Sequence, residues 1–325
     1  MKVIDLHCDT LLKLQRRDNT GDLYENRNTS LDIKRLIEGD YQAQFFAMYA
    51  LPESDCEGDH IDTMPQEELL ERMMESFHRN LGSHSKQIAF AGNFEGLRHN
   101  RESEKISAFL TIEDGAPIHG SMDRLKYYFD QGVRLITLTW NYENCFGFPN
   151  SDDKGIMSRG LKSFGSEAVE FMNDLGMLID VSHLSDGGFY DVLKISKKPF
   201  IASHSNAREL CNHRRNLTDD MIKKMAEIGG ISGLNYCAAF LRDGEEAFAR
   251  ISDMVRHLNH MKNKGGEDFV ALGSDYDGID NTVEIAGPHQ IDRFFSALRK
   301  GGWTEGQIEK LAYRNAERVI REVLK

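Results

Sequence analysis

The chain has 325 residues, 40% of them hydrophobic, and carries a formal net charge of −12. Apolar residues in this amount, spread along the whole chain, can form a large buried core and exclude extensive disorder. A surface this acidic repels phosphate backbones, and because no basic stripe offsets the repulsion, the composition argues against nucleic-acid binding.

The cysteines and the apolar segments bear on location. Five cysteines stand far apart at positions 8, 56, 145, 211 and 237, without a CxxC pair, and such a set is typical of reduced thiols in the cytoplasm. The opening MKVIDLHCDT lacks the features of a signal peptide, and no stretch approaches the roughly 18 apolar residues of a membrane span. We expect a cytoplasmic protein with no membrane partner, whose oligomeric state stays open, a homodimer included.

Short apolar runs alternate with longer amphipathic stretches along the whole chain. The expected strands are Val3–His7, Gln44–Tyr49, Ala108–Ile112, Arg134–Leu138, Met177–Val181, Phe200–Ser203, Gly230–Leu234 and Phe269–Leu272. The clearest helical patterns between them are Pro65–Leu81, Lys162–Leu175, Leu217–Ile228 and Arg250–Lys264. This alternation predicts parallel βαβ units, and eight strands favour a closed (β/α)8 barrel of the TIM type over an open sheet. Because no Pro/Gly/Ser-rich linker divides the chain, we expect a single α/β domain over residues 1–325.

The first expected strand ends in the sequence VIDLHCDT. His7 and Asp9 are two residues apart, so in an extended chain their side chains point to one face while Cys8 points to the other. An imidazole beside a carboxylate suits a zinc-type cation. We therefore interpret His7 and Asp9 as candidate metal ligands and Cys8 as a core residue.

Ionisable residues recur at the ends of later strands, where barrel enzymes place their active sites. Glu113 follows the third strand, and a buried carboxylate there needs a cation or hydrogen-bond partners. The fifth strand ends in LIDVSH and the sixth in FIASHS, so His183 and His204 occupy matching positions. After the eighth strand, we expect Asp275, nearer the barrel mouth, to transfer protons and Asp277 to lie in a turn.

These candidates outnumber the ligands of one catalytic zinc, which takes about three protein ligands and water. Two ions account for the number: His7 and Asp9 hold one, His183 and His204 hold the other, and Glu113 bridges them. A hydroxide shared by two such ions is activated near neutral pH and can attack a carbonyl that the metal polarises. The sequence thus predicts a hydrolase with two Zn²⁺ ions per chain, and it leaves manganese or cobalt open as alternatives.

With these residues in place, the chain resembles the membrane (renal) dipeptidase family of zinc metallopeptidases, within the amidohydrolase superfamily. The likeness runs through essentially the whole chain and is strongest at DLHCDT, LTIEDG, LTLTWN, DVSHLS, SHSNARELCNHRRNLTDDMI and GSDYDG. It implies a metallo-dipeptidase with a (β/α)8 barrel, often tolerant of a D-residue at the second position of the substrate. It also implies first-metal ligands at His7 and Asp9, a bridge at Glu113 and second-metal ligands at His183 and His204.

The resemblance gives two further residues a role. Arg215, in HRRNLTD, matches the arginine that pairs with the substrate carboxylate, and a guanidinium fork suits that task. Without the resemblance, Arg214 and Arg215 would be interpreted as a solvated pair before a helix. Asp275 matches the aspartate that moves the proton from the hydroxide to the leaving amine.

One position departs from the family. After the fourth strand many members carry a histidine that reaches the substrate carbonyl, whereas this chain has Trp140, which offers one N–H donor and does not titrate near neutral pH. We expect Trp140 and Asn141 to line the substrate pocket. The long segment that begins at Asn141, residues 141–160, is expected to cover this pocket. Either the metals stabilise the oxyanion alone, or Asn141 or Asn144 helps.

Two alternatives to the dipeptidase remain at this stage. The first is another metal-dependent amidohydrolase reaction, on a lactone, amide, imine or phosphoester, although many such relatives begin with HxH and bridge the metals with a carboxylated lysine. The second is a non-catalytic metal-binding relative, which only Trp140 supports. The retained ligands and Asp275 favour the dipeptidase, whose partner is a small dipeptide.

Overall fold

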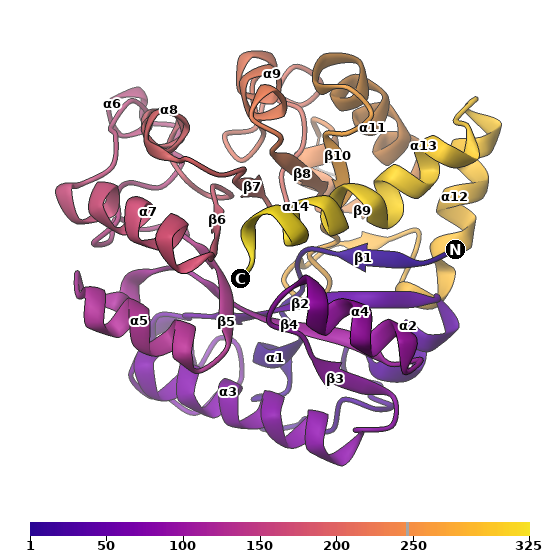
Figure 1. The fold of residues 1–325 in the computed structure, drawn as a ribbon, viewed down its shortest axis with the longest axis horizontal. Coiled ribbons are helices and arrows are strands. Elements are labelled where there is room, and N and C mark those ends of the chain that lie inside the picture. Colours follow the sequence, from indigo (N-terminus) through magenta and orange to yellow (C-terminus); the bar gives the residue numbers. More distant parts are fainter. Residues whose placement is uncertain (245–246) are drawn as a thin grey trace.

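The structure, a computed structural model, describes residues 1–244 and 247–325. Within them, eight parallel strands close into a barrel with helices between the strands (Figure 1), as the sequence predicts. The strand order is β2–β1–β10–β8–β7–β6–β5–β4, and pairing of β2 with β4 closes the ring. The barrel strands are β1 (Val3–Asp5), β2 (Tyr41–Tyr49), β4 (Ile106–Glu113), β5 (Val133–Thr137), β6 (Leu178–Asp180), β7 (Ile201–Ala202), β8 (Ile231–Leu234) and β10 (Val270–Leu272).

Helices surround the barrel, and the last of them crosses its amino-terminal end. They are α1 (Thr10–Lys13), α2 (Ile33–Glu38), α3 (Gln66–Ser83), α4 (Phe94–Glu102), α5 (Met122–Asp130), α6 (Lys154–Met157), α7 (Ser163–Leu175), α8 (Asp186–Ile195), α9 (Asp219–Glu227), α10 (Ala238–Leu241), α11 (Ile251–Gly265), α12 (Ile291–Lys300), α13 (Glu305–Glu309) and α14 (Asn315–Val323). The four predicted helical patterns correspond to α3, α7, α9 and α11.

Three barrel strands end earlier than their apolar runs predict, because two buried aspartates take backbone N–H groups out of the sheet. Asp5 Oδ1 accepts from the His7 N–H at 3.1 Å, and β1 ends at Asp5. Asp180 Oδ1 accepts from the N–H groups of Ser182 and Ser203 at 2.9 and 2.8 Å, and β6 and β7 end before those residues. The chain therefore leaves the sheet at the rim where the candidate ligands follow.

Three short strands are absent from the prediction. β3 (Ile88–Phe90) pairs with the first half of β4, and β5 pairs with the second half of β4 on the same side. β9 (Phe248–Ala249) and β11 (Thr282–Val283) form a separate two-stranded ladder. Each is only two or three residues long, and a run that short carries no periodicity to recognise.

An apolar cluster fills the barrel and is closed at one end by the last helix. It takes residues from every barrel strand, such as Phe45 and Phe109, whose rings stack at 4.5 Å. Val319 and Ile320 of α14 continue this cluster, and Arg318 donates to the carbonyls of Gly229 and Asp268, which precede β8 and β10. Helix α14, in yellow across the centre of Figure 1, thus caps the amino-terminal end of the barrel and leaves the carboxyl end open.

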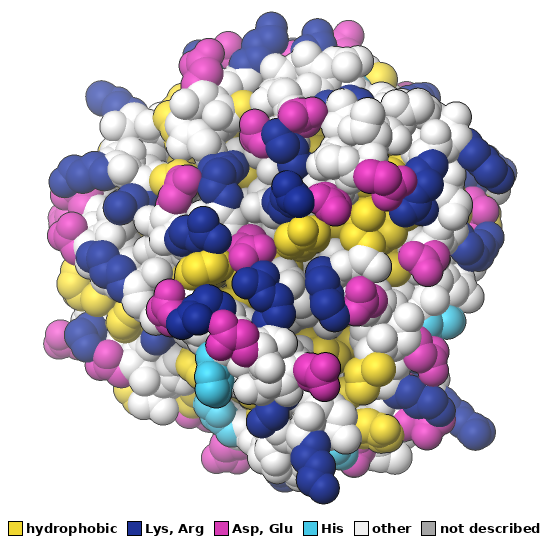
Figure 2. All heavy atoms as spheres, turned by 45° about the vertical axis from the view of Figure 1, so that its right-hand side comes forward, with side chains coloured by type: hydrophobic (Ala, Val, Ile, Leu, Met, Phe, Trp, Pro, Cys, Tyr) yellow, Lys and Arg dark blue, Asp and Glu magenta, His cyan; other side chains and the backbone are white. Residues whose placement is uncertain are grey.

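The surface mixes charges of both signs. On the face shown in Figure 2, Lys and Arg side chains alternate with Asp and Glu, and hydrophobic side chains form only small patches. Among the described residues, no helix has the length and apolar character to cross a bilayer.

Candidate active site

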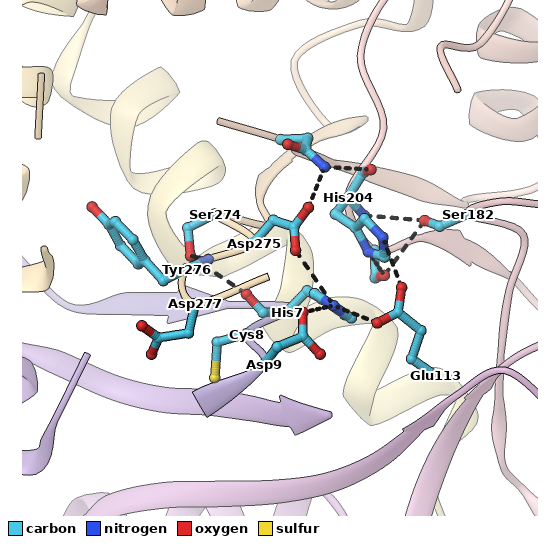
Figure 3. A network of polar contacts seen from close by, with 12 residues as sticks. His7, Cys8, Asp9, Glu113, Ser182, His204, Ser274, Asp275, Tyr276 and Asp277 are labelled. Carbon is cyan, nitrogen blue, oxygen red and sulfur yellow. Dashed lines mark hydrogen bonds and ion pairs between the residues drawn. The ribbon is translucent and has the colours of Figure 1, made fainter. Parts of the chain in front are cut away.

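Five predicted ligand side chains meet at the carboxyl rim of the barrel, each less than a tenth exposed. They come from the ends of four strands that lie far apart in the sequence: His7 and Asp9 after β1, Glu113 at the end of β4, His183 after β6 and His204 after β7. Figure 3 shows Asp9 and Glu113 directed toward the His7 ring while Cys8 points away. Cys8 is fully buried in the outer core, as expected.

Glu113 lies at the centre of this group. Its Oε2 is 3.4 Å from His7 Nε2, and its Oε1 lies 3.0 Å from His183 Nε2 and 3.5 Å from His204 Nε2. His7 Nε2 is also 3.2 Å from Asp9 Oδ2. The two oxygens of one carboxylate thus face two different groups of donors, an arrangement suited to a bridging ligand.

The ring nitrogens of the two later histidines leave space for a cation. His204 Nδ1 lies 2.7 Å from Ser203 Oγ, and His183 Nδ1 lies 3.2 Å from Asn141 Oδ1, a carbonyl oxygen to which it donates. The Nε2 atoms of the two rings are 3.2 Å apart. At this distance the lone pairs of the two Nε2 atoms repel each other. A metal ion bound between them and Glu113 would remove this repulsion, because both lone pairs would then coordinate the ion.

The pKa values of the buried carboxylates and imidazoles also favour a bound cation. Burial and the neighbouring Glu113 raise the pKa of Asp9 well above its usual value, and Asp9 Oδ1 has no hydrogen-bond partner. Burial and the nearby Arg215 lower the pKa of His183 to about 3, so its imidazole is neutral. Burial also lowers the pKa of His204, whereas Asp9 and Glu113 outweigh burial at His7 and raise the pKa of that imidazole. Two neutral imidazoles beside crowded carboxylates suit a divalent cation. His7, Glu113 and His204 form one compact donor group, and His7, Asp9 and Asp275 form another.

Asp275 lies beside this cluster without being central to it. Its Oδ1 is 3.8 Å from His7 Nε2, and its Oδ2 accepts from Asn235 Nδ2 at 2.9 Å. Burial raises the pKa of Asp275 to about 6, since the opposing effect of His7 is smaller. The backbone of Asp275 has a φ of 62°, in the left-handed region, which is typical of residues held in place at functional sites.

Two neighbours of Asp275 have structural roles. Asp277, which points away from His7 in Figure 3, accepts from Thr10 Oγ1 and from the Ser30 N–H, both at 2.6 Å. A Cβ atom at Gly278 would overlap Asp9 Oδ2, so only glycine fits against this carboxylate.

Arg215 is the predicted cation for the substrate carboxylate. It is 5% exposed, and its Nη atoms make long contacts of 3.3 Å to Ser205 Oγ and 3.4 Å to the His204 carbonyl. Its Nε has no hydrogen-bond partner, and among the described residues its Nη atoms contact uncharged oxygens, not a carboxylate. A guanidinium buried beside two neutral oxygens retains unused donors for an anion.

One cavity of about 630 Å³ joins these groups. Asp9, Glu113, His183, Asp275 and Arg215 all line it. Trp140 and Asn141 also line this cavity, as predicted.

The indole of Trp140 packs between two other side chains of the cavity wall. Its ring lies 4.8 Å from the ring of Tyr49 and 6.0 Å from that of His183. Asn144 has a different role from the one considered above, because its amide donates to Asp114 and to the Leu138 carbonyl and so holds the loop. Asn141 is therefore the asparagine that reaches the site.

The structure adds residues that the sequence analysis did not select. Asn235, directly after β8, holds Asp275, and His213 lines the cavity with its ring 4.6 Å from Phe240. An asparagine at the end of a strand in the sequence GLNY was a usable signal, because the rim of a barrel gathers strand-end polar residues.

The chain is similar to known proteins over its whole length. The model of the family described as Membrane dipeptidase (Peptidase family M19) matches residues 1–325. An uncharacterized dipeptidase of Schizosaccharomyces pombe is 31% identical over 348 residues, which cover 99% of this chain and 80% of that protein.

Two solved structures share the fold. A metallo peptidase from Rhodobacter sphaeroides, liganded with a phosphinate mimic of the dipeptide L-Ala-D-Ala, superposes with a TM-score of 0.90 at 27% identity and covers 99% of both chains. A dipeptidase described as a metallo peptidase of family M19 superposes with a TM-score of 0.89, also at 27% identity, over 100% of this chain and 99% of the other.

Proposed function

The chain belongs to the membrane dipeptidase family, peptidase family M19, and from this we propose that it hydrolyses free dipeptides, including those with a D-residue at the second position. It is a metallo-dipeptidase, hence a hydrolase, of the amidohydrolase superfamily. The inclusion of D-residues is supported by the L-Ala-D-Ala mimic bound to the Rhodobacter sphaeroides relative.

One observation carries the substrate proposal: the same cavity holds the ligand cluster around Glu113 and the buried, unpaired Arg215. A free dipeptide has a carboxylate close to its single peptide bond. Arg215 would bind this carboxylate through its guanidinium fork and so place the peptide carbonyl over the cluster. A longer peptide lacks a charge at that position and would leave Arg215 buried without a partner.

We propose that the cluster binds two Zn²⁺ ions. His7 and Asp9 would hold one and His183 and His204 the other, with one oxygen of Glu113 for each; other divalent transition metals suit the same nitrogen and oxygen donors. Such ions, when bound, lower the pKa of water towards neutrality and polarise a carbonyl.

Asp275 would carry the proton. A carboxyl group whose pKa is about 6 can both accept and release a proton near neutral pH. Both steps are needed here, because the residue first takes a proton from water and then passes it to the leaving amine. Asn235 keeps this carboxylate turned toward the cluster. Trp140 would shield one side of the cavity from water, and Asn141 would hold the His183 ring.

We place the protein in the cytoplasm. Its five cysteines are all free thiols, and Cys8, Cys56 and Cys211 are buried. Unpaired cysteines are maintained in a reducing compartment.

The test combines metal analysis with a substrate panel. The chain purified with Zn²⁺ is expected to hold two ions and to cleave L-Ala-D-Ala and L-Ala-L-Ala, and Glu113→Gln is expected to lose both metal and turnover. Acetylated alanine amide and a γ-lactone serve as the comparison substrates. Strong lactone opening without dipeptide cleavage would assign the site to another amidohydrolase reaction.

A further inference from the structure

We infer that Asp180 is a positioning residue: through the hydroxyl of Ser203 it fixes the tautomer of His204 so that Nε2 faces Glu113. Asp180 and Ser203 do not line the cavity and act on the ligand cluster only through His204. Its consequence for metal binding rests on the proposed function, whereas the tautomer itself is a property of the chain alone.

Asp180 is a fully buried carboxylate whose two oxygens accept from different kinds of donor. Oδ1 accepts from the backbone N–H groups of Ser182 and Ser203 at 2.9 and 2.8 Å. Oδ2 accepts from the hydroxyls of Thr137 at 2.6 Å and Ser203 at 2.5 Å. Four donors on one carboxylate fix it in one orientation.

The position of the protons follows from the hydrogen-bond rules. A carboxylate only accepts, so at 2.5 Å the single hydroxyl hydrogen of Ser203 must point to Asp180 Oδ2. Ser203 Oγ can then only accept from His204 Nδ1, which lies 2.7 Å away. His204 therefore carries its hydrogen on Nδ1, and the lone pair of Nε2 faces Glu113 at 3.5 Å.

The other two histidines of the cluster have weaker support. His183 donates from Nδ1 to Asn141 at 3.2 Å, on an exposed loop residue, and Nδ1 of His7 has no partner. Among the described residues, His204 is the one of these three histidines whose Nδ1 is linked to a buried carboxylate, through the Ser203 hydroxyl. Partners of this kind orient metal-ligating histidines and make them more basic, and their loss typically costs about 10- to 100-fold in metal affinity.

The barrel contains a matched comparison for Asp180. Asp5, at the end of β1, also accepts from the N–H two residues ahead, that of His7, and from an N–H beside the neighbouring strand, that of Ser274. Asp5 binds at His7 and Ser274, whereas Asp180 binds the Ser203 hydroxyl that contacts His204. Asp5→Asn is thus a control that perturbs a strand end without touching the relay.

The first test is nuclear magnetic resonance of the full chain, metal-free and labelled with ¹⁵N-histidine. Long-range ¹H–¹⁵N spectra report which ring nitrogen is protonated, and comparison with His204→Gln assigns the signal. In the wild type, Nδ1 of His204 is expected to be protonated and Nε2 unprotonated.

Two variants should change this signature in different ways. In Asp180→Asn the new amide can donate to Ser203, so the hydroxyl turns to donate to His204 Nδ1 and the proton moves to Nε2. Ser203→Ala leaves Nδ1 without a partner, and a mixture of tautomers should appear. Asp5→Asn and Thr137→Val should keep the wild-type signature.

The second measurement is zinc affinity by competition with a chromophoric chelator. We expect Asp180→Asn and Ser203→Ala to bind one zinc equivalent about 10- to 100-fold more weakly and Thr137→Val to bind as the wild type does. An unchanged His204 signature in both variants would overturn the relay. A changed signature with unaltered zinc affinity would uphold the relay and overturn its role at the proposed metal site.

Discussion

Two charged residues divide the work in the cavity, and each can be tested by a single substitution. Asp275 lies beside the ligand cluster, 3.8 Å from His7, and Arg215 lines the same cavity with no carboxylate partner among the described residues. One is placed to move a proton and the other to hold a charge. Their substitutions should therefore affect different kinetic constants.

Asp275→Asn is expected to lower kcat by about 10²- to 10⁴-fold, the usual loss when a general acid–base group is removed. The amide oxygen can still accept from Asn235, so the local geometry, the metal content and KM should change little. Steady-state kinetics and metal analysis on one preparation check this. Asp277→Asn is the matched control, since that carboxylate binds Thr10 and Ser30 instead of facing the cluster; an unchanged kcat in Asp275→Asn would remove the assigned role.

Arg215→Lys should lower kcat/KM for L-Ala-D-Ala by about 10- to 100-fold, because an ammonium group cannot make the paired contacts of a guanidinium. The loss should be much smaller for the C-terminal amide of the same dipeptide, which has no carboxylate. The ratio of kcat/KM between the two substrates is the measurement. Arg214→Lys is the control, since Arg214 lines the same cavity but already pairs with Asp152 at 2.5 Å. Equal losses on acid and amide would mean that Arg215 does not bind the carboxylate.

Among the elements, helix α11 is attached to the rim loops through a buried histidine. His257 is fully buried, accepts from the Ala207 N–H at 3.2 Å and donates to the Leu241 carbonyl at 2.8 Å. Ala207 follows the end of β7, so this neutral imidazole connects the helical layer to the segment that carries His204. Burial lowers the pKa of His257 to about 4.

This contact makes stability depend on pH. An unfolded histidine has a pKa of about 6.5, so between pH 6.5 and 4 the unfolded chain binds a proton that the folded chain does not. The contribution of His257 is complete above pH 6.5 and is lost as the pH falls to 4, by about 3 kcal/mol at most. Chemical denaturation of the wild type and of His257→Gln at several pH values should give curves that converge on acidification. Parallel curves would contradict the assignment.

The barrel strands also show how much of the fold the sequence can predict. All eight barrel strands were predictable, because buried parallel strands are continuous apolar runs. Their ends were predicted less well. Asp5 and Asp180 end three strands early because they also bind backbone N–H groups after the neighbouring strand, and one such partner, Ser274, is 269 residues away from Asp5 in the sequence. No local pattern encodes such a contact.

The candidate site was predictable for a related reason. His7, Glu113, His183 and His204 each follow an apolar run, and a barrel brings all strand ends to one rim. Asn235 and Ser203 were missed because an amide or a hydroxyl after a strand is common, and their roles appear only once the neighbouring side chain is known. The left-handed backbone of His183, with a φ of 68°, is likewise set by tertiary contacts.

For the molecule as a whole, the two ends of the barrel have separate tasks. Helix α14 closes the amino-terminal end with apolar side chains, whereas the carboxyl end collects carboxylates and imidazoles. The site therefore joins parts of the chain as distant as His7 and Asp275, and it gathers the carboxylates of Asp9, Glu113 and Asp275, which repel one another without a cation. Metal binding is expected to stabilise the entire fold, because it connects strands around the ring.

Metal removal should accordingly lower the thermal midpoint of the whole chain. A ligand at about 1,000 times its Kd adds about 4 kcal/mol, and for a chain of this length each such ion corresponds to several degrees. Calorimetry of the zinc-loaded and chelator-treated protein measures the difference, and zinc titrated back should restore the midpoint with saturation at two equivalents. Glu113→Gln, which lacks the central charge, should show little difference between the two conditions. If the zinc-loaded and the chelator-treated wild-type protein unfold at the same temperature, the cluster is not a metal site. Ions that bind at four strand ends bind only the folded chain, and they must therefore shift the unfolding equilibrium.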